Sequence, residues 1–239
     1  MKIEVLFPEI CHLSGDPMNI DYLALCLPDA EILYTSLSEA PRFLSEEVAL
    51  VYLGSVTEEG LSLVVEALTP HLDGIKAKIE DGQHILLTGN VLDAFGIEVT
   101  SDSDFFLRGL GLLPTCAHYT MLHRHNSFFL GTLGDTEIVG FKSLFGLTYP
   151  TSDDVPPLFQ TVRGVGRNKD TAAEGFRLNN LMATHLTGPL LVLNPPFTSM
   201  LLRELGEEGA PLAFEEAAMQ AYRTRVKEFH EEFRDPIYH

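Results

Sequence analysis

The sequence lacks tryptophan, has few cysteines and is poor in positive charge. Its 239 residues include no Trp, three Cys, 16 basic and 34 acidic residues, a formal net charge of −18. A surface this negative repels phosphates, so nucleic acid and anionic membrane faces are not expected partners. The cysteines (Cys11, Cys26 and Cys116) are odd in number and far apart, which argues against a disulfide framework and favours a reducing compartment. We therefore expect a cytoplasmic protein.

Long hydrophobic runs are missing as well. No window approaches the roughly 18 uninterrupted apolar residues that a membrane helix needs. Glu4 and Pro8 interrupt the first residues, whose apolar run is too short for a signal peptide. Hydrophobic residues nevertheless make up 45% of the chain, which argues against disorder. The length predicts one large domain, or one domain with an appendage.

Short apolar runs alternate with helical patterns over the first 96 residues. Strands are predicted at 3–7, 31–34, 48–53 and 84–88, and helices at 16–28, 58–68 and 72–81. This alternation is typical of an α/β fold with a parallel sheet. The nearly continuous apolar run at 48–53 indicates a strand covered on both faces.

The second half of the chain has a different pattern. Strand-like runs occupy 120–125, 127–131, 137–141 and 181–185, and Gly134-Asp135 predicts a hairpin turn. The glycine-rich residues 164–168 read as a loop that resembles a phosphate loop only superficially, since they neither follow a buried strand nor open a helix. Residues 197–205 are predicted to be helical.

The last segment, 212–233, reads as an amphipathic helix. We divide the chain into a domain at 1–205 and an appended C-terminal helix at 206–239. Most such helices bury their apolar stripe on their own domain. The alternative is a docking stripe for a partner, made of Tyr222, Val226, Phe229 and Phe233.

Five short stretches are similar, in this order, to motifs of one protein family. They lie at 15–20, 53–57, 79–89, 109–113 and 188–195. Together they resemble the class I glutamine amidotransferases of the CobB/CobQ (cobyric acid synthase) type, and within that type the bacterial GatD-like glutaminase subunits. The resemblance covers roughly residues 14 to 202. It implies a flavodoxin-like fold with a mostly parallel central sheet and flanking helices, and a hetero-oligomer with a Mur-ligase-like synthetase.

The resemblance also implies where the chemistry of the family would lie. Family members attack glutamine with a cysteine on a tight strand-to-helix turn and use a distant histidine as base. The nucleophile position falls on Thr88 and the histidine position on Thr187. The ligand-binding positions that the resemblance implies are Gly54, Ser55, Gly89 and Phe128. With the cysteine and the histidine replaced, we predict a catalytically degenerate subunit, a pseudoenzyme that serves as a binding or scaffold partner of an ATP-dependent synthetase.

Two alternative hypotheses assign a function to the pocket in which family members bind glutamine. His185 and Thr187 would share one strand face, so His185 is a possible substitute base for Thr88, or a partner could supply that group; glutamine or another amide would be the substrate. Alternatively, the old glutamine pocket binds a small ligand as a sensor.

No cofactor is expected, and a metal site is the weaker interpretation of the histidines. His123 and His125 would lie on one strand face near His118 and could ligate zinc. No cysteine pair or carboxylate stands at a matching spacing, which favours a solvated strand face.

Overall fold

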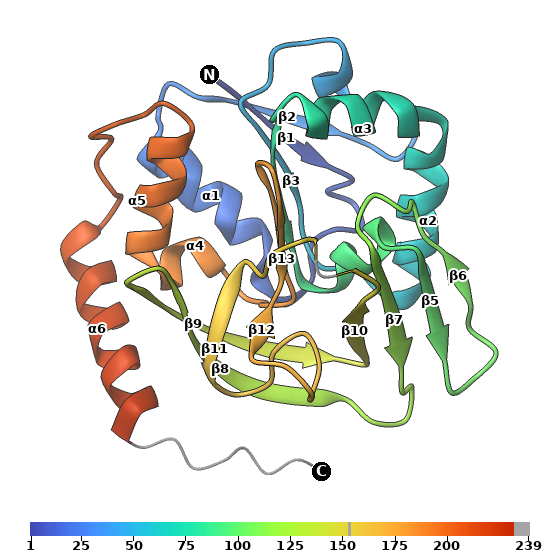
Figure 1. Ribbon diagram of the computed structural model, residues 1–239. Helices are drawn as coiled ribbons and strands as arrows, with labels where there is room; N and C mark the ends of the chain where they lie inside the picture. Colours follow the sequence, from blue (N-terminus) through green and yellow to red (C-terminus); the bar gives the residue numbers. More distant parts are fainter. Residues whose placement is uncertain (153, 232–239) are drawn as a thin grey trace.

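A six-stranded sheet forms the centre of the molecule (Figure 1). The computed structural model describes residues 1–152 and 154–231. The strand order is β13-β14-β4-β3-β1-β2. The strands are β1 (Lys2–Leu6), β2 (Glu31–Thr35), β3 (Leu50–Leu53), β4 (His84–Thr88), β13 (Phe176–Leu178) and β14 (Leu181–Thr184). All neighbours pair in parallel except β13 with β14, so the predicted α/β fold with a mostly parallel central sheet is confirmed.

Helices cover both faces of this sheet, as the apolar strands require (Figure 1). The helices are α1 (Pro17–Cys26), α2 (Glu58–Leu68), α3 (Leu72–Glu80), α4 (Leu190–Leu193), α5 (Pro195–Glu204) and α6 (Glu215–Glu231). Buried side chains of α2 and α3 pack into one core, and those of α1, α4 and α5 into the other. Short 3₁₀ turns lie at η1 (Leu13–Gly15), η2 (Arg42–Leu44), η3 (Thr69–His71) and η4 (Gly89–Phe95).

Two smaller four-stranded sheets sit beside the carboxyl ends of the central strands. One has the order β10-β7-β5-β6 and the other β12-β11-β8-β9. Their strands are β5 (Glu98–Ser101), β6 (Leu107–Arg108), β7 (Thr115–Tyr119), β8 (His125–Leu133), β9 (Thr136–Leu144), β10 (Gly146–Pro150), β11 (Phe159–Arg163) and β12 (Ala173–Glu174). The predicted hairpin at Gly134-Asp135 joins β8 to β9. The predicted strand at 120–125 is wrong, because 120–124 form a turn between β7 and β8.

The C-terminal helix packs on its own domain. The Tyr222 hydroxyl donates to the Glu137 carbonyl at 2.8 Å, and the Phe229 ring centroid lies 5.6 Å from that of Phe128. His230 Nε2 lies 2.6 Å from Glu137 Oε1. Phe233, the last residue of the predicted stripe, is outside the described residues. The domain boundary between 205 and 206 stays a prediction.

Membrane insertion through a helix finds no support in the described residues. Among the described helices, none combines the length and the apolar character needed to cross a bilayer.

Candidate functional site

A small polar pocket lies where the loops after the parallel strands meet. This is the edge at which open α/β sheets bind ligands. The pocket holds about 130 Å³. The segments that follow the central strands contribute Leu13, Ser14, Ser55, Val56, Thr57, Glu58, Asn90 and Thr187. The smaller sheets with their loops contribute Tyr119, Arg124, Ser143, Leu144 and Phe145.

The tight turn after β4 is made by Gly89, not by Thr88. Gly89 has φ +71°, a conformation that costs glycine little and other residues more. Thr88 is fully buried, and its hydroxyl shares a 2.8 Å hydrogen bond with the Tyr52 hydroxyl under the turn. Thr88 is also absent from the residues that line the pocket. Thr88, the position inferred for the nucleophile, therefore lies beneath the turn, and the residue that makes the turn has no side chain.

Ser55 approaches this turn from the neighbouring loop. A Cβ atom added to Gly89 would overlap the Ser55 hydroxyl and lie 2.7 Å from Ser55 Cβ. The same hydroxyl donates to Asp16 Oδ2 at 2.5 Å, and the Ser55 backbone N–H donates to that oxygen at 2.6 Å. Asp16 is fully buried, and its Oδ1 has no hydrogen-bond partner. Burial raises the pKa of Asp16 to about 6, although the bonds from Ser55 act to lower it.

The two positions predicted from the end of β14 lie in different surroundings. Thr187 lines the pocket, and both its N–H and its hydroxyl donate to the Phe141 carbonyl, at 2.9 and 3.1 Å. β14 ends at Thr184, so His185 and Thr187 do not share a strand face. His185 is 1% exposed, and its Nε2 lies 3.0 Å from Thr148 Oγ1 and 3.3 Å from an Asp93 carboxylate oxygen.

The proposed pairing of Thr88 with His185 is not present within residues 1–152 and 154–231. No hydrogen bond joins their side chains there: the threonine is bonded to Tyr52, and the imidazole to Thr148 and Asp93. His185 belongs instead to a buried polar network. Its backbone N–H donates to Glu174 Oε1 at 2.8 Å, so it helps to satisfy a buried carboxylate.

Gly54 and Phe128, both predicted at the ligand, do not line the pocket. A Cβ on Gly54 would lie 2.9 Å from Asp16 Cβ, so this glycine allows the loop to pack closely. Phe128 is 45% exposed and packs against Phe141, with 5.7 Å between ring centroids. The cation at the pocket is Arg124, four residues earlier in the sequence.

Arg124 was missed because the sequence around it was read as a strand. Its Nη1 donates to Ser143 Oγ at 3.3 Å, and its guanidinium carbon lies 4.3 Å from the centroid of the Phe145 ring. Asp16 precedes α1, but its carboxylate accepts from the Ser55 loop and does not cap the helix. The signal for Asp16 was present, because it stands inside the first of the five family-like stretches.

Comparison with known proteins agrees with this arrangement of strands and loops. No family model matches the sequence. The GatD subunit of lipid II isoglutaminyl synthase (glutamine-hydrolysing) from Streptococcus pneumoniae is 25% identical over 234 residues, covering 92% of this chain and 88% of that protein. The Staphylococcus aureus protein of the same description is 26% identical over 176 residues, 73% of this chain and 71% of that protein.

Solved structures give the same fold. The structure of PurLQS from Thermotoga maritima matches with a TM-score of 0.53 at 15% identity, over 94% of this chain and 98% of that one. A crystal structure of a glutamine amidotransferase matches with a TM-score of 0.55 at 12% identity, over 85% and 98%. The chain is a GatD-like class I glutamine amidotransferase domain.

The pocket of this GatD-like domain is not lined by a cysteine or a histidine. Cys11 and Cys26 are buried, Cys116 is partly buried, and all three are free thiols. Burial raises the pKa of Cys11 well above its usual value, which keeps the thiol protonated.

The histidines considered for zinc do not form a site. His123 lies in the turn before β8 and His125 begins that strand, so they do not share a strand face as predicted. Across the described part of the chain, no group of three or more metal-binding side chains comes together.

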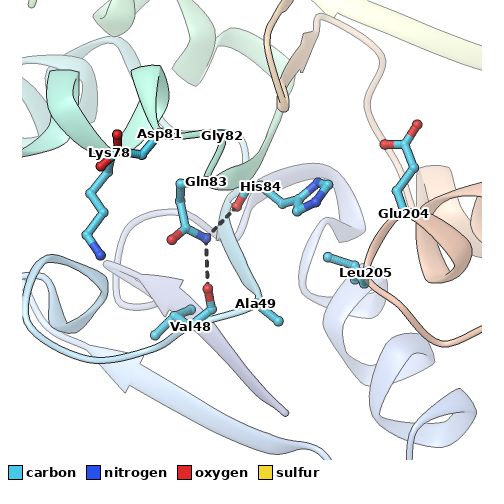
Figure 2. Close-up of a pocket in the computed structure, with 9 residues that line it drawn as sticks. All are labelled: Val48, Ala49, Lys78, Asp81, Gly82, Gln83, His84, Glu204 and Leu205. Carbon is cyan, nitrogen blue, oxygen red and sulfur yellow. Dashed lines mark hydrogen bonds between the residues drawn. The ribbon is translucent and has the colours of Figure 1, made fainter.

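A second and larger cavity, about 300 Å³, opens at the opposite edge of the central sheet (Figure 2). It lies at the amino ends of β3 and β4. Gln83 Nε2 donates to the Val48 and His84 carbonyls, at 2.9 and 3.2 Å. Burial lowers the pKa of His84, which favours its neutral form. Open parallel sheets bind their ligands at the carboxyl ends of the strands, not at this amino-end edge. The polar pocket around Ser55 is therefore the candidate site of the GatD-like domain.

Proposed function

We propose that this GatD-like domain has lost cysteine–histidine glutaminase chemistry and serves in the cytoplasm as a binding or scaffold subunit of a Mur-ligase-like, ATP-dependent synthetase. The observation that carries the proposal is the turn after β4. Gly89, which has no side chain, makes this turn, the inferred nucleophile position Thr88 is buried beneath it, and Thr187, the position inferred for the histidine, lines the pocket.

The chemical argument is that neither half of the reaction remains. A thiolate attacks the amide, and an imidazole first takes its proton and later protonates the leaving amine. Gly89 has no side chain, and a threonine hydroxyl at 187 does not act as a base near neutral pH. Loss of a nucleophile or its base commonly costs about 10⁴-fold or more in rate.

The subunit role rests on the relatives. Both bacterial proteins are described as subunits of a synthase, and this chain covers 88% and 71% of their lengths. A chain with their fold and without their reagents keeps the surface that a partner binds and loses the reaction. We therefore propose a hetero-oligomer in which the partner carries the synthetase chemistry.

Ammonia release from glutamine tests the catalytic half of the proposal. The chain should release no ammonia above the buffer rate, alone or co-expressed with a Mur-ligase-like protein encoded beside it, while the S. pneumoniae GatD with its partner serves as positive control. Ammonia release that survives alanine substitution of Cys11, Cys26 and Cys116 would contradict it. Co-elution in size-exclusion chromatography tests the partner, and two separate peaks would count against the complex.

The two alternative hypotheses, catalysis by Thr88 with His185 and a ligand sensor, differ in their support. Catalysis by Thr88 with His185 lacks support, because their side chains are held in separate hydrogen bonds. A ligand sensor keeps the support of an open pocket, since Phe128 does not fill it and Arg124 and Glu58 offer charges of both signs. A glutamine-dependent rise in melting temperature, lost in Arg124→Ala, is the expected result for a sensor.

A further inference from the structure

The Ser55 hydroxyl occupies the place of the missing side chain at the turn. A Cβ built on Gly89 would overlap Ser55 Oγ. The Ser55 oxygen therefore lies where the side chain of a larger residue at position 89 would start. Ser55 reaches this place from the loop after β3 and lines the pocket. A reactive oxygen has thus taken the position of the lost side chain, although it comes from another loop.

Asp16 is placed as a proton acceptor for this hydroxyl. The O–H points at Asp16 Oδ2 over 2.5 Å, within the reach that a general base needs. The carboxylate is fully buried, and its second oxygen, Oδ1, has no hydrogen-bond partner. The Ser55 backbone N–H also donates to Asp16 Oδ2, at 2.6 Å, and this bond holds the two residues in position.

Asn90 supplies a donor on the other side of the turn. Its Oδ1 accepts the Val56 N–H at 3.0 Å, and its amide NH₂ faces the Tyr119 hydroxyl, which leaves one of the two amide hydrogens for a ligand. Asn90 lines the pocket at 8% exposure. A side-chain amide of this kind stabilises the oxyanion of acyl transfer in other enzymes and is worth about 10²–10³ in kcat.

We propose that Ser55 and Asp16 form a serine–carboxylate pair that cleaves small esters in this pocket. Ser55 Oγ attacks the carbonyl carbon while its proton passes to Asp16. The bond from the carbonyl carbon to the alcohol oxygen breaks, and Asp16 returns the proton to the departing alcohol. Water then attacks the acyl-serine, gives a proton to Asp16, and the freed Ser55 oxygen takes it back, so that ester and water become acid and alcohol.

The substrate class follows from what the pocket holds. An alkoxide leaves far more readily than an amine, and no histidine lines the pocket to protonate a departing amine. Esters are therefore favoured over the amide of glutamine. The volume of about 130 Å³ limits the acyl group to a few heavy atoms. This activity goes beyond the proposed subunit role and needs neither the partner nor glutamine.

Covalent labelling tests the assignment directly. The full-length chain is treated with methanesulfonyl fluoride, the adduct is mapped by peptide mass spectrometry, and p-nitrophenyl acetate hydrolysis is followed in parallel. We expect the adduct on Ser55, no adduct or turnover in Ser55→Ala, and at least about 10²-fold slower labelling in Asp16→Asn. Mapping the adduct on the unmodified chain makes the test independent of how the variants fold.

A matched control is available outside the pocket. Ser152 Oγ donates to Asp154 Oδ2 at the same 2.5 Å, but this pair is exposed. Ser152→Ala should keep the full rate of labelling and turnover. No adduct, or an adduct elsewhere than Ser55, would overturn the assignment and leave the proposed subunit role standing. Ammonia release that depends on Ser55 would instead overturn the loss of glutaminase activity.

Discussion

The Tyr52 and Thr88 hydroxyls are joined at 2.8 Å beneath the turn that ends β4. The Tyr52 hydroxyl also donates to the Asp16 carbonyl at 3.1 Å and accepts from Asn19 Nδ2 at 2.9 Å. Both hydroxyl-bearing residues are at most 1% exposed. The last side chain of β4 thus supports the floor of the site.

Replacing Thr88 by valine tests this supporting role. The variant keeps the shape and loses one buried hydrogen bond, so the free energy of unfolding should fall by about 1 kcal/mol. Urea unfolding measures it. Labelling of Ser55 should be unchanged within about twofold. Thr224→Val removes an exposed hydroxyl bonded to the Gln220 carbonyl and should change stability by less than about 0.5 kcal/mol. Loss of labelling in Thr88→Val at full stability would contradict the supporting role.

Gly89 should tolerate a side chain much less well than a glycine of similar backbone conformation. Gly111 has φ +66° and nothing within 4 Å of an added Cβ, whereas an added Cβ on Gly89 (φ +71°) meets Ser55. Gly111→Ala should cost about 1 kcal/mol from backbone strain alone. Gly89→Ala adds overpacking and should cost about 2–4 kcal/mol.

A second substitution, at Ser55, should restore part of the stability that Gly89→Ala loses. Ser55→Gly in the Gly89→Ala background should recover part of the lost stability, because it removes the overlapping atoms. Denaturant unfolding of the four proteins of the cycle, the wild type, the two single variants and the double variant, measures the coupling. Equal costs for Gly89→Ala and Gly111→Ala, or no coupling between positions 55 and 89, would show that Ser55 does not occupy the place of the missing side chain.

Sequence patterns predicted the regular elements well and the site less well, for a physical reason. α2 and β4 match their predicted ranges because each has a clear apolar period bounded by a cap or a glycine. Periodicity does not tell which residue turns the chain, so the pattern alone does not show whether Thr88 or Gly89 makes the turn. The turn at 120–124 is predicted as a strand, and the pattern therefore does not place Arg124 at the pocket.

The sequence pattern does not predict which side chains after different strands of the sheet come into contact. Asp16 follows β1 and Ser55 follows β3, 39 residues apart along the chain. Their contact depends on β1 and β3 being neighbours, which a single sequence does not fix. The family-like stretches include both loops, but which side chains in them meet depends on the order of the strands in the folded sheet.

Asp16 should make the protein less stable as pH rises. Its pKa is about 6 in the fold, against roughly 3.9 in an unfolded chain, so the native state holds a proton that the unfolded state has lost. The unfolding free energy should therefore fall between about pH 4 and 6, by on the order of 3 kcal/mol, and this contribution should then level off. Its neighbours Cys11 and Tyr52 stay neutral in this window, because burial raises the pKa of each.

Asp16→Asn isolates that contribution, since asparagine does not titrate. Urea unfolding of both proteins between pH 4 and 7.5 gives the difference in stability at each pH. We expect the wild type to lose stability relative to the variant as pH rises through this range. A difference that stays flat, or that moves the other way, would show that the Asp16 carboxyl is not held in its neutral form by burial.

Lys142 and Glu174 form a buried ion pair under the second small sheet, and breaking it should destabilise the fold strongly. Both side chains are at most 4% exposed, and the ammonium also donates to the Gly166 carbonyl at 2.7 Å. Burial acts to raise the pKa of Glu174, but the attraction of Lys142 holds it below its usual value. Lys142→Met leaves that carboxylate uncompensated and should cost about 3–5 kcal/mol in urea unfolding.

The exposed pair of Lys227 and Glu231, 3.9 Å apart, is the control, and Lys227→Met should cost less than about 0.5 kcal/mol. A cost at 142 as small as that at 227 would mean that the pair is solvated rather than buried.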